Sequence, residues 1–321
     1  MKFLCIGSAV QDVFLSNSEA FTPVCESPEK CFNMLELGAK ADVNKIDFAT
    51  GGGATNAATT FARQGFHSIF MGTIGHDPAG EAVLAALDAE GVDTTHVSYS
   101  DKYNTGYSVL LLAPTGERTI LTYRGASTHY DARNFDLAKL GQKVDWLYVS
   151  TMAGSFDALA KIFDQARSLK IKIAFNPGKK ELANASKLRG LLDDVEILIA
   201  NADEMAQIVA GETSEELVRH AQNYCPIVIV SDGPNGVVAA DRKQIVVAGL
   251  YEDVPVVDRT GAGDAFGSGF VASYAAYADL AQAVTFASAN STSVIGQIGA
   301  KAGILHGAAK LHDMPIEVKE L

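Results

Sequence analysis

Residues 258–266 (DRTGAGDAF) carry the clearest chemistry in the sequence. Three small residues at 261–263 separate an apolar run at 254–257, which we expect to be a strand, from a small-residue helix over 265–276. Such a turn points successive N–H groups at one place and opens a helix N-terminus, where an anion is stabilised. A bound phosphate would repel an acid there unless the acid had a task, so Asp264 is a candidate general base. A hydroxyl that loses its proton to Asp264 beside a phosphoryl group held by amides describes phosphoryl transfer.

The overall composition limits the classes of partner. The 321 residues carry a formal net charge of −12, and apolar residues make up 48% of the chain. Because an acidic surface repels nucleic acid and anionic membranes, we expect neither as the main partner. Residues 1–7 turn at once to polar residues, which predicts a first strand and not a signal peptide, and no apolar run approaches membrane-spanning length. We therefore expect a cytoplasmic protein that acts on small molecules.

The four cysteines fall into two pairs. Cys5 and Cys225 lie in apolar strand-like runs, which is typical of buried thiols. Cys25 and Cys31 are six residues apart in a loop-like segment, and no C-x-x-C spacing indicates zinc. A disulfide between Cys25 and Cys31 is the alternative, but we expect free thiols.

Strand-like and helix-like runs alternate regularly from residue 145 onward. Such alternation predicts a mainly parallel, doubly wound sheet. The strands are expected at 146–149, 171–175, 197–199 and 227–230. The helices are expected at 156–169, 181–192, 203–209 and 214–224.

The first part of the chain is less regular. Residues 3–10 predict a buried strand, with Asp12 just past its carboxyl end, where open α/β sheets bind ligands. Residues 13–50 are long and poorly periodic, and 95–125 contain two alternating runs on either side of a Pro-Thr-Gly-Glu turn. We expect these two segments to form a lid, with the second as a β-hairpin, inserted in a single domain over residues 1–321.

Three more motifs stand out: residues 51–58 (GGGATNAA), which lead into an expected helix, and 201–204 (NADE) and 231–236 (SDGPNG), which follow expected strands. Together with the motif around Asp264, and in this order, they resemble the ribokinase family of carbohydrate kinases, also called the PfkB family. The resemblance spans residues 7–300. It implies a ribokinase-like three-layer α/β/α fold with a mainly parallel sheet and a small β lid. It also implies Mg²⁺-dependent transfer of the γ-phosphoryl group of ATP to a primary hydroxyl of a sugar.

The resemblance also assigns roles to individual residues. The general base would be Asp264, beside an anion hole made by Gly261, Ala262 and Gly263. The substrate would be bound by Asp12, Gly51, Gly52 and Asn56. The nucleotide would be bound by Asn176, Asn201, Glu204, Ser231, Gly233, Gly236, Asn290 and Gly299.

Several of these assignments have alternatives. Asn201 and Glu204 would place Mg²⁺, largely through water, although the same pair predicts a helix-capping box. Asn290 would bond the purine or only pack. Asp258 and Thr260 belong to a loop where many relatives hold a monovalent cation such as K⁺.

The chain departs from ribokinase itself at two places. Ribokinase has Lys where this chain has Gly53, and its acid after the lid falls, by simple register, near Met152. We therefore expect that ribose is not the best acceptor. A nucleoside kinase of the same family and a non-catalytic sugar-binding relic are the alternatives.

Two expectations concern the lid. Arg118 is expected to be a solvated lid charge, with a phosphate contact as the alternative. A free strand edge in the lid hairpin would pair two subunits, so we expect a homodimer.

Overall fold

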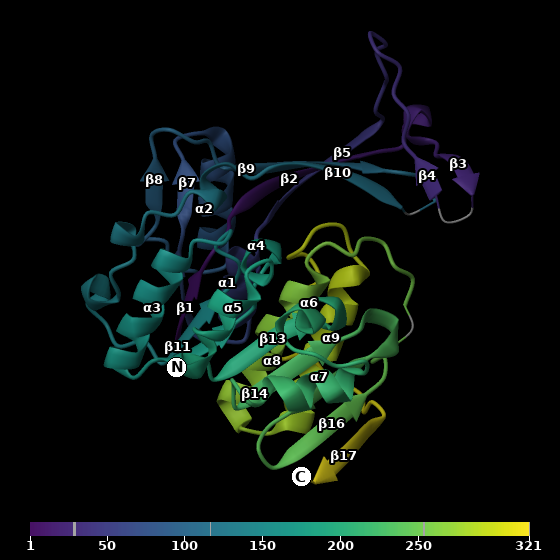
Figure 1. Cartoon of the computed structure of the whole chain (residues 1–321). Coiled ribbons are helices and arrows are strands. Elements are labelled where there is room, and N and C mark those ends of the chain that lie inside the picture. Colours follow the sequence, from purple (N-terminus) through teal and green to yellow (C-terminus); the bar gives the residue numbers. More distant parts are fainter. Residues whose placement is uncertain (28–29, 116, 253, 321) are drawn as a thin grey trace.

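The structure is a computed structural model that describes residues 1–27, 30–115, 117–252 and 254–320 (Figure 1). Its main sheet has the strand order β17-β16-β15-β14-β13-β12-β11-β1-β6. The parallel strands are β6 (His67–Met71), β1 (Lys2–Ile6), β11 (Trp146–Val149), β12 (Lys172–Phe175), β13 (Ile197–Asn201) and β14 (Ile227–Ser231). The antiparallel strands at one edge are β15 (Val237–Ala240), β16 (Gln244–Ala248) and β17 (Ile316–Glu320).

Helices cover both faces of this sheet. Along β1, Leu4 and Ile6 enter one hydrophobic core while Phe3 and Cys5 enter the other, because successive side chains of a strand point to opposite faces. The first core contains side chains of α3 (Phe156–Leu169), α4 (Lys179–Leu182), α5 (Ala185–Arg189), α6 (Ala202–Ile208) and α7 (Ser214–Ala221). The second contains side chains of α1 (Gly53–Arg63), α2 (Pro78–Ala89), α8 (Ala262–Tyr277) and α9 (Leu280–Ile295). The predicted three-layer α/β/α fold is confirmed.

A second sheet forms the lid and projects beyond the body of the molecule (Figure 1). Its strand order is β10-β9-β2-β5, with β10 (Arg118–Tyr123), β9 (Gly106–Leu112), β2 (Val10–Ser16) and β5 (Lys45–Gly51). The short hairpin of β3 (Val24–Ser27) and β4 (Lys30–Phe32) lies at its tip. Two further short strands, β7 (Thr73–Gly75) and β8 (Ser98–Ser100), pair at the side of the body. The predicted β9–β10 hairpin is present, although Gly116 of its turn lies outside the described residues.

Three expected elements differ in the structure. The strand expected over 3–10 is two strands, because β1 ends at Ile6 and Gly7 (φ 148°) turns the chain into β2. Asp12 therefore lies within the lid sheet and not just past β1. No strand forms over the described part of 254–257, and the helix expected over 181–192 breaks at Asn184, whose side chain caps α5.

The expectation of free thiols at Cys25 and Cys31 was wrong, because the structure joins them in a disulfide. The segment that looks like a loop forms β3 and β4, whose antiparallel register places these two residues directly opposite each other with Cα atoms 4.0 Å apart. Cys5 and Cys225 are buried free thiols, as expected. Disulfides are rare in cytoplasmic proteins, so the Cys25–Cys31 pair counts against the predicted cytoplasmic location. Among the described residues, no helix is long and apolar enough to cross a membrane.

Candidate active site

The carboxyl ends of four neighbouring parallel strands bring polar residues to one end of the main sheet. Ser150 follows β11 and Asn176 follows β12, while Asn201 and Ser231 end β13 and β14 as register partners. Open α/β sheets bind their ligands at this end. The candidate site is therefore assembled here.

Asp264 lies in the first turn of α8. Its Oδ2 accepts a hydrogen bond of 2.8 Å from Asn56 Nδ2. No donor among the described residues reaches Oδ1, and a Cβ atom on Gly53 would lie only 3.1 Å from it. Burial raises the pKa of Asp264, and the hydrogen bond from Asn56 and the charge of Lys301 oppose that rise. A carboxylate with one oxygen fixed and the other open is suited to accept a proton.

The turn that precedes α8 leaves backbone amides without strong partners. Gly261 begins it in the left-handed region (φ 81°), and a Cβ atom there would lie 2.7 Å from Ala300 Cα, so only glycine fits. The Ala262 amide makes a 3.3 Å bond to a backbone carbonyl, and no carbonyl of the described chain accepts from the amides of Gly263 or Asp264. Open space surrounds Gly263. The start of α8 can therefore accept an anion.

Gly51 and Gly52 join β5 to α1, and we call them the acceptor loop. Gly52 has φ 104°, and any side chain on it would overlap the carbonyl of Ser8. The Thr55 hydroxyl donates to the Gly51 carbonyl at 2.7 Å and holds the loop on the helix. A side chain at Gly51 would overlap the carboxylate of Asp12, which places that carboxylate directly against the loop.

Asp12 reaches the acceptor loop from the lid. It is buried in β2, between Ala49 of β5 and Ser108 of β9. Burial raises the pKa of Asp12 to about 6, the Ser108 hydroxyl and the charge of Lys301 lower it, and Asp258 raises it slightly. An ionised carboxylate here would accept hydrogen bonds from two ligand hydroxyls. Because Asp12 lies in the lid sheet, binding of such a ligand would be linked to the position of the lid.

Asn201 and Glu204 form the capping box of α6. Asn201 Oδ1 accepts from the Glu204 amide at 2.9 Å, and Glu204 Oε2 accepts from the Asn201 amide at 3.0 Å. Burial raises the pKa of Glu204, and the negative charges of Asp264 and Asp203 add to the rise. Glu204 Oε1 stays available, and one carboxylate oxygen with retained waters fits Mg²⁺. No group of three or more His, Cys, Asp or Glu side chains among the described residues is arranged to hold a metal directly.

Of the other predicted nucleotide-binding residues, some lie in an open turn and one joins two strands. Ser231, Gly233 and Gly236 belong to an open turn after β14, in which Asn235 donates to the Asp232 carboxylate. Asn176 Nδ2 donates to the Ile199 carbonyl and ties β12 to β13.

Asn290 has a structural role in this arrangement. It is 0% exposed, its Nδ2 donates to the Ala265 carbonyl, and its Oδ1 accepts from the Leu305 amide. These bonds connect α9 to α8 and to the segment after α9. Because both ends of its amide are occupied inside the protein, we leave Asn290 out of the nucleotide site.

The loop before α8 closes around Asp258. Thr260 donates to Asp258 Oδ1 through its amide and its hydroxyl, and the Gly299 amide donates to Oδ2. Arg118 Nε lies 3.9 Å from Asp258 Oδ1, so the expectation of a solvated lid charge was wrong. Arg118 lies on the face of the lid sheet that carries Asp12, and this face points toward the site.

A model of the pfkB family of carbohydrate kinases matches residues 24–306. The chain belongs to this family. Ribokinase from Haemophilus influenzae is 26% identical over 266 residues, which cover 80% of this chain and 84% of that protein. The family is one of phosphotransferases with a hydroxyl acceptor, so this chain is a sugar or nucleoside kinase.

Two solved structures show the same fold. A putative ribokinase II from E. coli, in complex with ATP and Mg²⁺, aligns with a TM-score of 0.78 at 20% identity, over 94% of this chain and 95% of that one. A nucleoside kinase from Methanocaldococcus jannaschii, described as an archaeal member of the ribokinase family, aligns with a TM-score of 0.76 at 18% identity, over 95% and 94%.

Two residues at the site of this pfkB-family chain, Ser150 and Lys301, were not predicted from the sequence. Ser150, and not Met152, is the residue after β11 that faces the start of α1, since a Cβ atom on Gly53 would lie 2.9 Å from Ser150 Cβ. Met152 is buried in the core with α3, so the register that placed it in the site was wrong. Lys301 donates into the β5–α1 junction. A serine at a strand end and a lysine after a Gly-Ala pair carry no distinctive signal alone.

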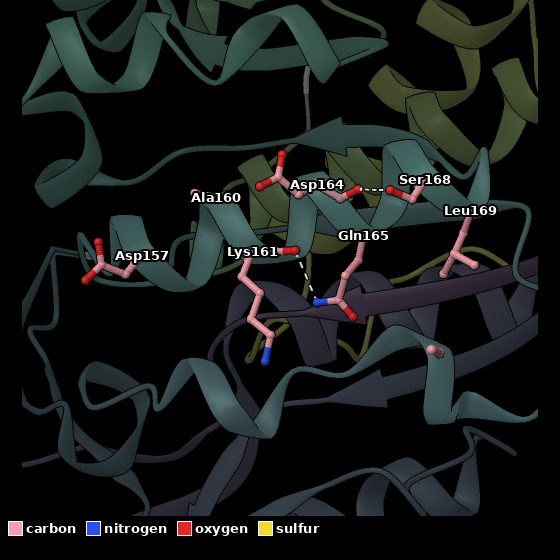
Figure 2. A pocket seen from close by; sticks show the side chains of 8 residues that line it. Asp157, Ala160, Lys161, Asp164, Gln165, Ser168 and Leu169 are labelled. Carbon is pink, nitrogen blue, oxygen red and sulfur yellow. Dashed lines mark hydrogen bonds between the residues drawn. The ribbon is translucent and has the colours of Figure 1, made fainter.

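A surface hollow on the outer side of α3 contains none of these groups (Figure 2). Two of its lining side chains, Lys161 and Gln165, donate to the carbonyls of Ala132 and Phe135. They fasten the segment before β11 onto the helix. We assign this hollow a packing role.

Proposed function

We propose that this kinase transfers the γ-phosphoryl group of ATP to a primary hydroxyl of a sugar, with Asp264 as the general base. The observation that carries the proposal is the position of Asp264. One carboxylate oxygen is held by Asn56 and the other opens beside Gly53, at the start of a helix with free amides. The acceptor hydroxyl would lose its proton to this open oxygen.

The acceptor is bound from two sides in this proposal. Gly51 and Gly52 let the sugar approach the backbone, while Asp12 and Asn56 read its hydroxyls. Asn56 Oδ1 is buried without a partner among the described residues, which supports this role. Because Asp12 is part of the lid, closure of the lid on the sugar would complete the site and exclude water as a competing acceptor.

The donor is bound at the opposite side. The amides at Gly261, Ala262 and Gly263 would stabilise charge on the transferring phosphoryl group. The turn at Ser231, Gly233 and Gly236 would contact the nucleotide phosphates, beside Asn176. Bound Mg²⁺, placed by Asn201 and Glu204 largely through water, would neutralise phosphate charge.

The identity of the acceptor is tested by ADP release over pentoses, hexoses, phosphosugars and nucleosides. Gly53 has no side chain and Ser150 is neutral, so no charged group at this point selects a free ribose. The space that Gly53 leaves beside Ser150 also favours the alternative of a nucleoside kinase. We expect strong ADP release with one of these classes and a lower kcat/KM for ribose than for the best acceptor. A kcat/KM for ribose above all others, or no release with any hydroxyl compound, would contradict the proposal.

Potassium activation belongs to the same proposal. Asp258, Thr260 and Gly299 lie together, and the Asp258 carboxylate already accepts three hydrogen bonds and faces Arg118. Replacing K⁺ by a bulky organic cation in the assay should lower the rate if K⁺ adds to these partners. An unchanged rate would mean that the internal donors suffice.

We also propose a homodimer through the lid. The face of the lid sheet turned away from the site exposes Ile46, Phe48, Leu121 and Tyr123, and β10 is a free edge. Such an edge and apolar face are covered in stable proteins. Light scattering on the wild type and on Phe48→Asp tests this proposal. We expect a dimeric wild type and a variant that dissociates to monomers, and a monomeric wild type would contradict the proposal.

A further inference from the structure

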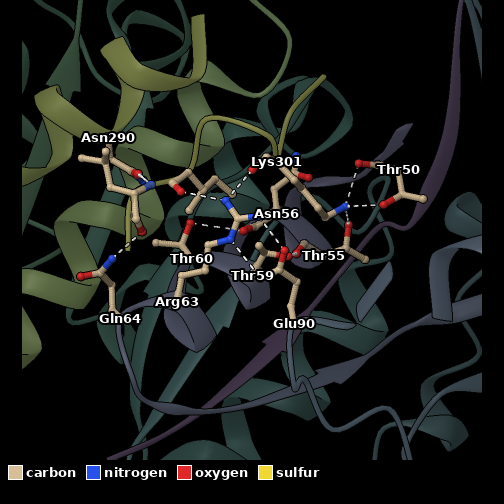
Figure 3. A network of polar contacts seen from close by, with 12 residues as sticks. Thr50, Thr55, Asn56, Thr59, Thr60, Arg63, Gln64, Glu90, Asn290 and Lys301 are labelled. Atoms are coloured by element: carbon tan, nitrogen blue, oxygen red, sulfur yellow. Dashed lines mark hydrogen bonds and ion pairs between the residues drawn. The ribbon is translucent and has the colours of Figure 1, made fainter. Parts of the chain in front are cut away.

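Lys301 contacts both ends of the β5–α1 junction (Figure 3). Its Nζ donates to the Thr50 carbonyl at 2.8 Å, to the Thr50 hydroxyl at 3.1 Å and to the Thr55 hydroxyl at 2.9 Å. These three bonds use all three ammonium protons. Thr50 precedes the acceptor loop, and Thr55 follows it.

Thr55 passes this contact to the loop itself. Its hydroxyl lies 2.7 Å from the Gly51 carbonyl and 3.0 Å from the Gly52 carbonyl, and donates to these oxygens. The hydroxyl oxygen accepts from Lys301 at the same time. The ammonium therefore orients both the strand that enters the loop and the hydroxyl that holds the loop on α1.

The backbone of Lys301 lies between the anion hole and the far end of α1. The preceding residue, Ala300, packs against Gly261 of the anion hole. Arg63 Nη1 donates to the Lys301 carbonyl at 2.8 Å and to the Ile304 carbonyl at 2.7 Å, and its guanidinium pairs with Glu90 (Figure 3). The segment that carries Lys301 thus packs against the anion hole and is tied to α1, while its side chain reaches the β5–α1 junction.

We propose that Lys301 is a positioning residue that holds the acceptor loop in register with the anion hole. The distance between the two sets how a bound hydroxyl faces the phosphoryl group. The inference rests on the proposed roles of the acceptor loop and of residues 261–263.

The charges around Lys301 support this role. The carboxylates of Asp12 and Asp264 both attract its ammonium. Burial lowers the pKa of Lys301 to about 7, and these two carboxylates and Glu90 oppose that shift while Arg63 adds to it. The ammonium of Lys301 therefore interacts favourably with both carboxylates as well as holding the loop.

Steady-state kinetics of Lys301→Met test the proposal, with Lys310→Met as the matched control at an exposed position. A loosened loop misplaces the hydroxyl, and a displacement of about 1 Å can cost about 10²-fold. We expect kcat/KM for the acceptor to fall by about 10- to 100-fold, with the KM for ATP within about twofold of the wild type. Lys310→Met should match the wild type.

A double-mutant cycle with Thr55→Val adds a second readout. If Lys301 acts through Thr55, the double variant should lose little more than Lys301→Met alone. Should Lys301→Met fail to fold, Thr55→Val carries the same test of acceptor kcat/KM against ATP KM. Equal losses for both substrates, additive losses, or a lower melting temperature with wild-type kinetics would overturn the proposal.

The failure of this inference is distinguishable from failure of the proposed function. Asp264→Asn, measured beside these variants, tests the base alone. Loss of turnover in Asp264→Asn with wild-type kinetics in Lys301→Met removes only the role of Lys301. Retained turnover in Asp264→Asn removes the mechanism itself.

Discussion

The anion hole and the acceptor side meet at Asp264, but the chain builds them in different ways. The anion hole comes from one continuous stretch, closed by bonds between near neighbours such as Thr260 to Asp258 and the Ala265 amide to the Gly261 carbonyl. The acceptor side collects Asp12 from the lid, the loop after β5, Ser150 after β11 and Lys301 after α9. In the proposed mechanism the phosphoryl site is therefore encoded locally, while acceptor choice would depend on how distant segments pack.

The largest effect should come from a substitution in the anion-hole turn, which is formed by one continuous stretch of chain. Gly261→Ala places a side chain at φ 81° and against Ala300, so the turn must move. Displaced amides would lower kcat by about 10²–10³-fold, and the strained backbone would cost about 1–3 kcal/mol of unfolding free energy.

Gly263→Ala is the matched control for stability, because open space surrounds Gly263. Thermal unfolding of both variants and kcat of Gly261→Ala decide the point. A Gly261→Ala enzyme with wild-type melting temperature and turnover would show that the turn geometry is unimportant.

The next largest effect should come from adding a side chain at Gly53, where the acceptor side meets Asp264. A Cβ atom on Gly53 would lie 2.9 Å from Ser150 Cβ and 3.1 Å from Asp264 Oδ1, where we propose that the acceptor hydroxyl binds. Gly53→Ala should lower kcat/KM for the acceptor by about 10- to 100-fold and leave affinity for an ATP analogue unchanged. Gly249→Ala, with nothing within 4 Å, is the control. Equal weakening of nucleotide binding would place Gly53 on the donor side instead.

The pH dependence should show carboxylates from both halves. A general base at Asp264 works only when ionised, and burial raises its pKa, so kcat/KM should fall as pH drops through that raised pKa. Below that pKa the fall is about tenfold per pH unit. Burial also raises the pKa of Asp12 to about 6, so the fall should steepen as Asp12 loses its charge.

The measurement is kcat/KM from about pH 8 down to the lowest pH at which the enzyme stays folded. Asp12→Asn should reduce the steepness while the fall set by Asp264 remains. A flat profile over this range would contradict an ionised Asp264 as the base.

The smallest effect should come from the magnesium position. Glu204→Gln keeps an acceptor for the capping box but removes the charge, so the Mg²⁺ concentration for half-maximal rate should rise several-fold, by about 1 kcal/mol or less of binding free energy. Glu216→Gln is the matched control, because Glu216 completes the same kind of box with Thr213 at the start of α7. An identical Mg²⁺ titration for Glu204→Gln would reduce Glu204 to a helix cap.

The contrast between the halves also explains what could be predicted from the sequence. The strands from β11 to β14 are predictable because each is a short apolar run between helical patterns, and the anion-hole turn is predictable because its three small residues, Gly261 to Gly263, are contiguous. Asp12 was assigned to the wrong element, since Gly7 alone does not reveal that one apolar run divides between two sheets. Ser150 and Lys301 escaped notice because their importance comes from partners more than 90 residues away, as between Ser150 and Gly53. The Cys25–Cys31 disulfide was rejected because the β3–β4 pairing that creates it has no apolar alternation.

The base itself is tested most directly by Asp264→Asn, in single-turnover rate and in affinity for a non-hydrolysable ATP analogue. Asparagine keeps the size of the side chain but cannot accept the proton, and residues 261–263 still form the anion site. The account predicts a single-turnover rate lower by at least about 10²-fold. Nucleotide affinity should be equal or slightly higher, because a negative charge near the phosphates has gone. Near-wild-type turnover on the best acceptor, or a loss confined to KM, would contradict Asp264 as the general base.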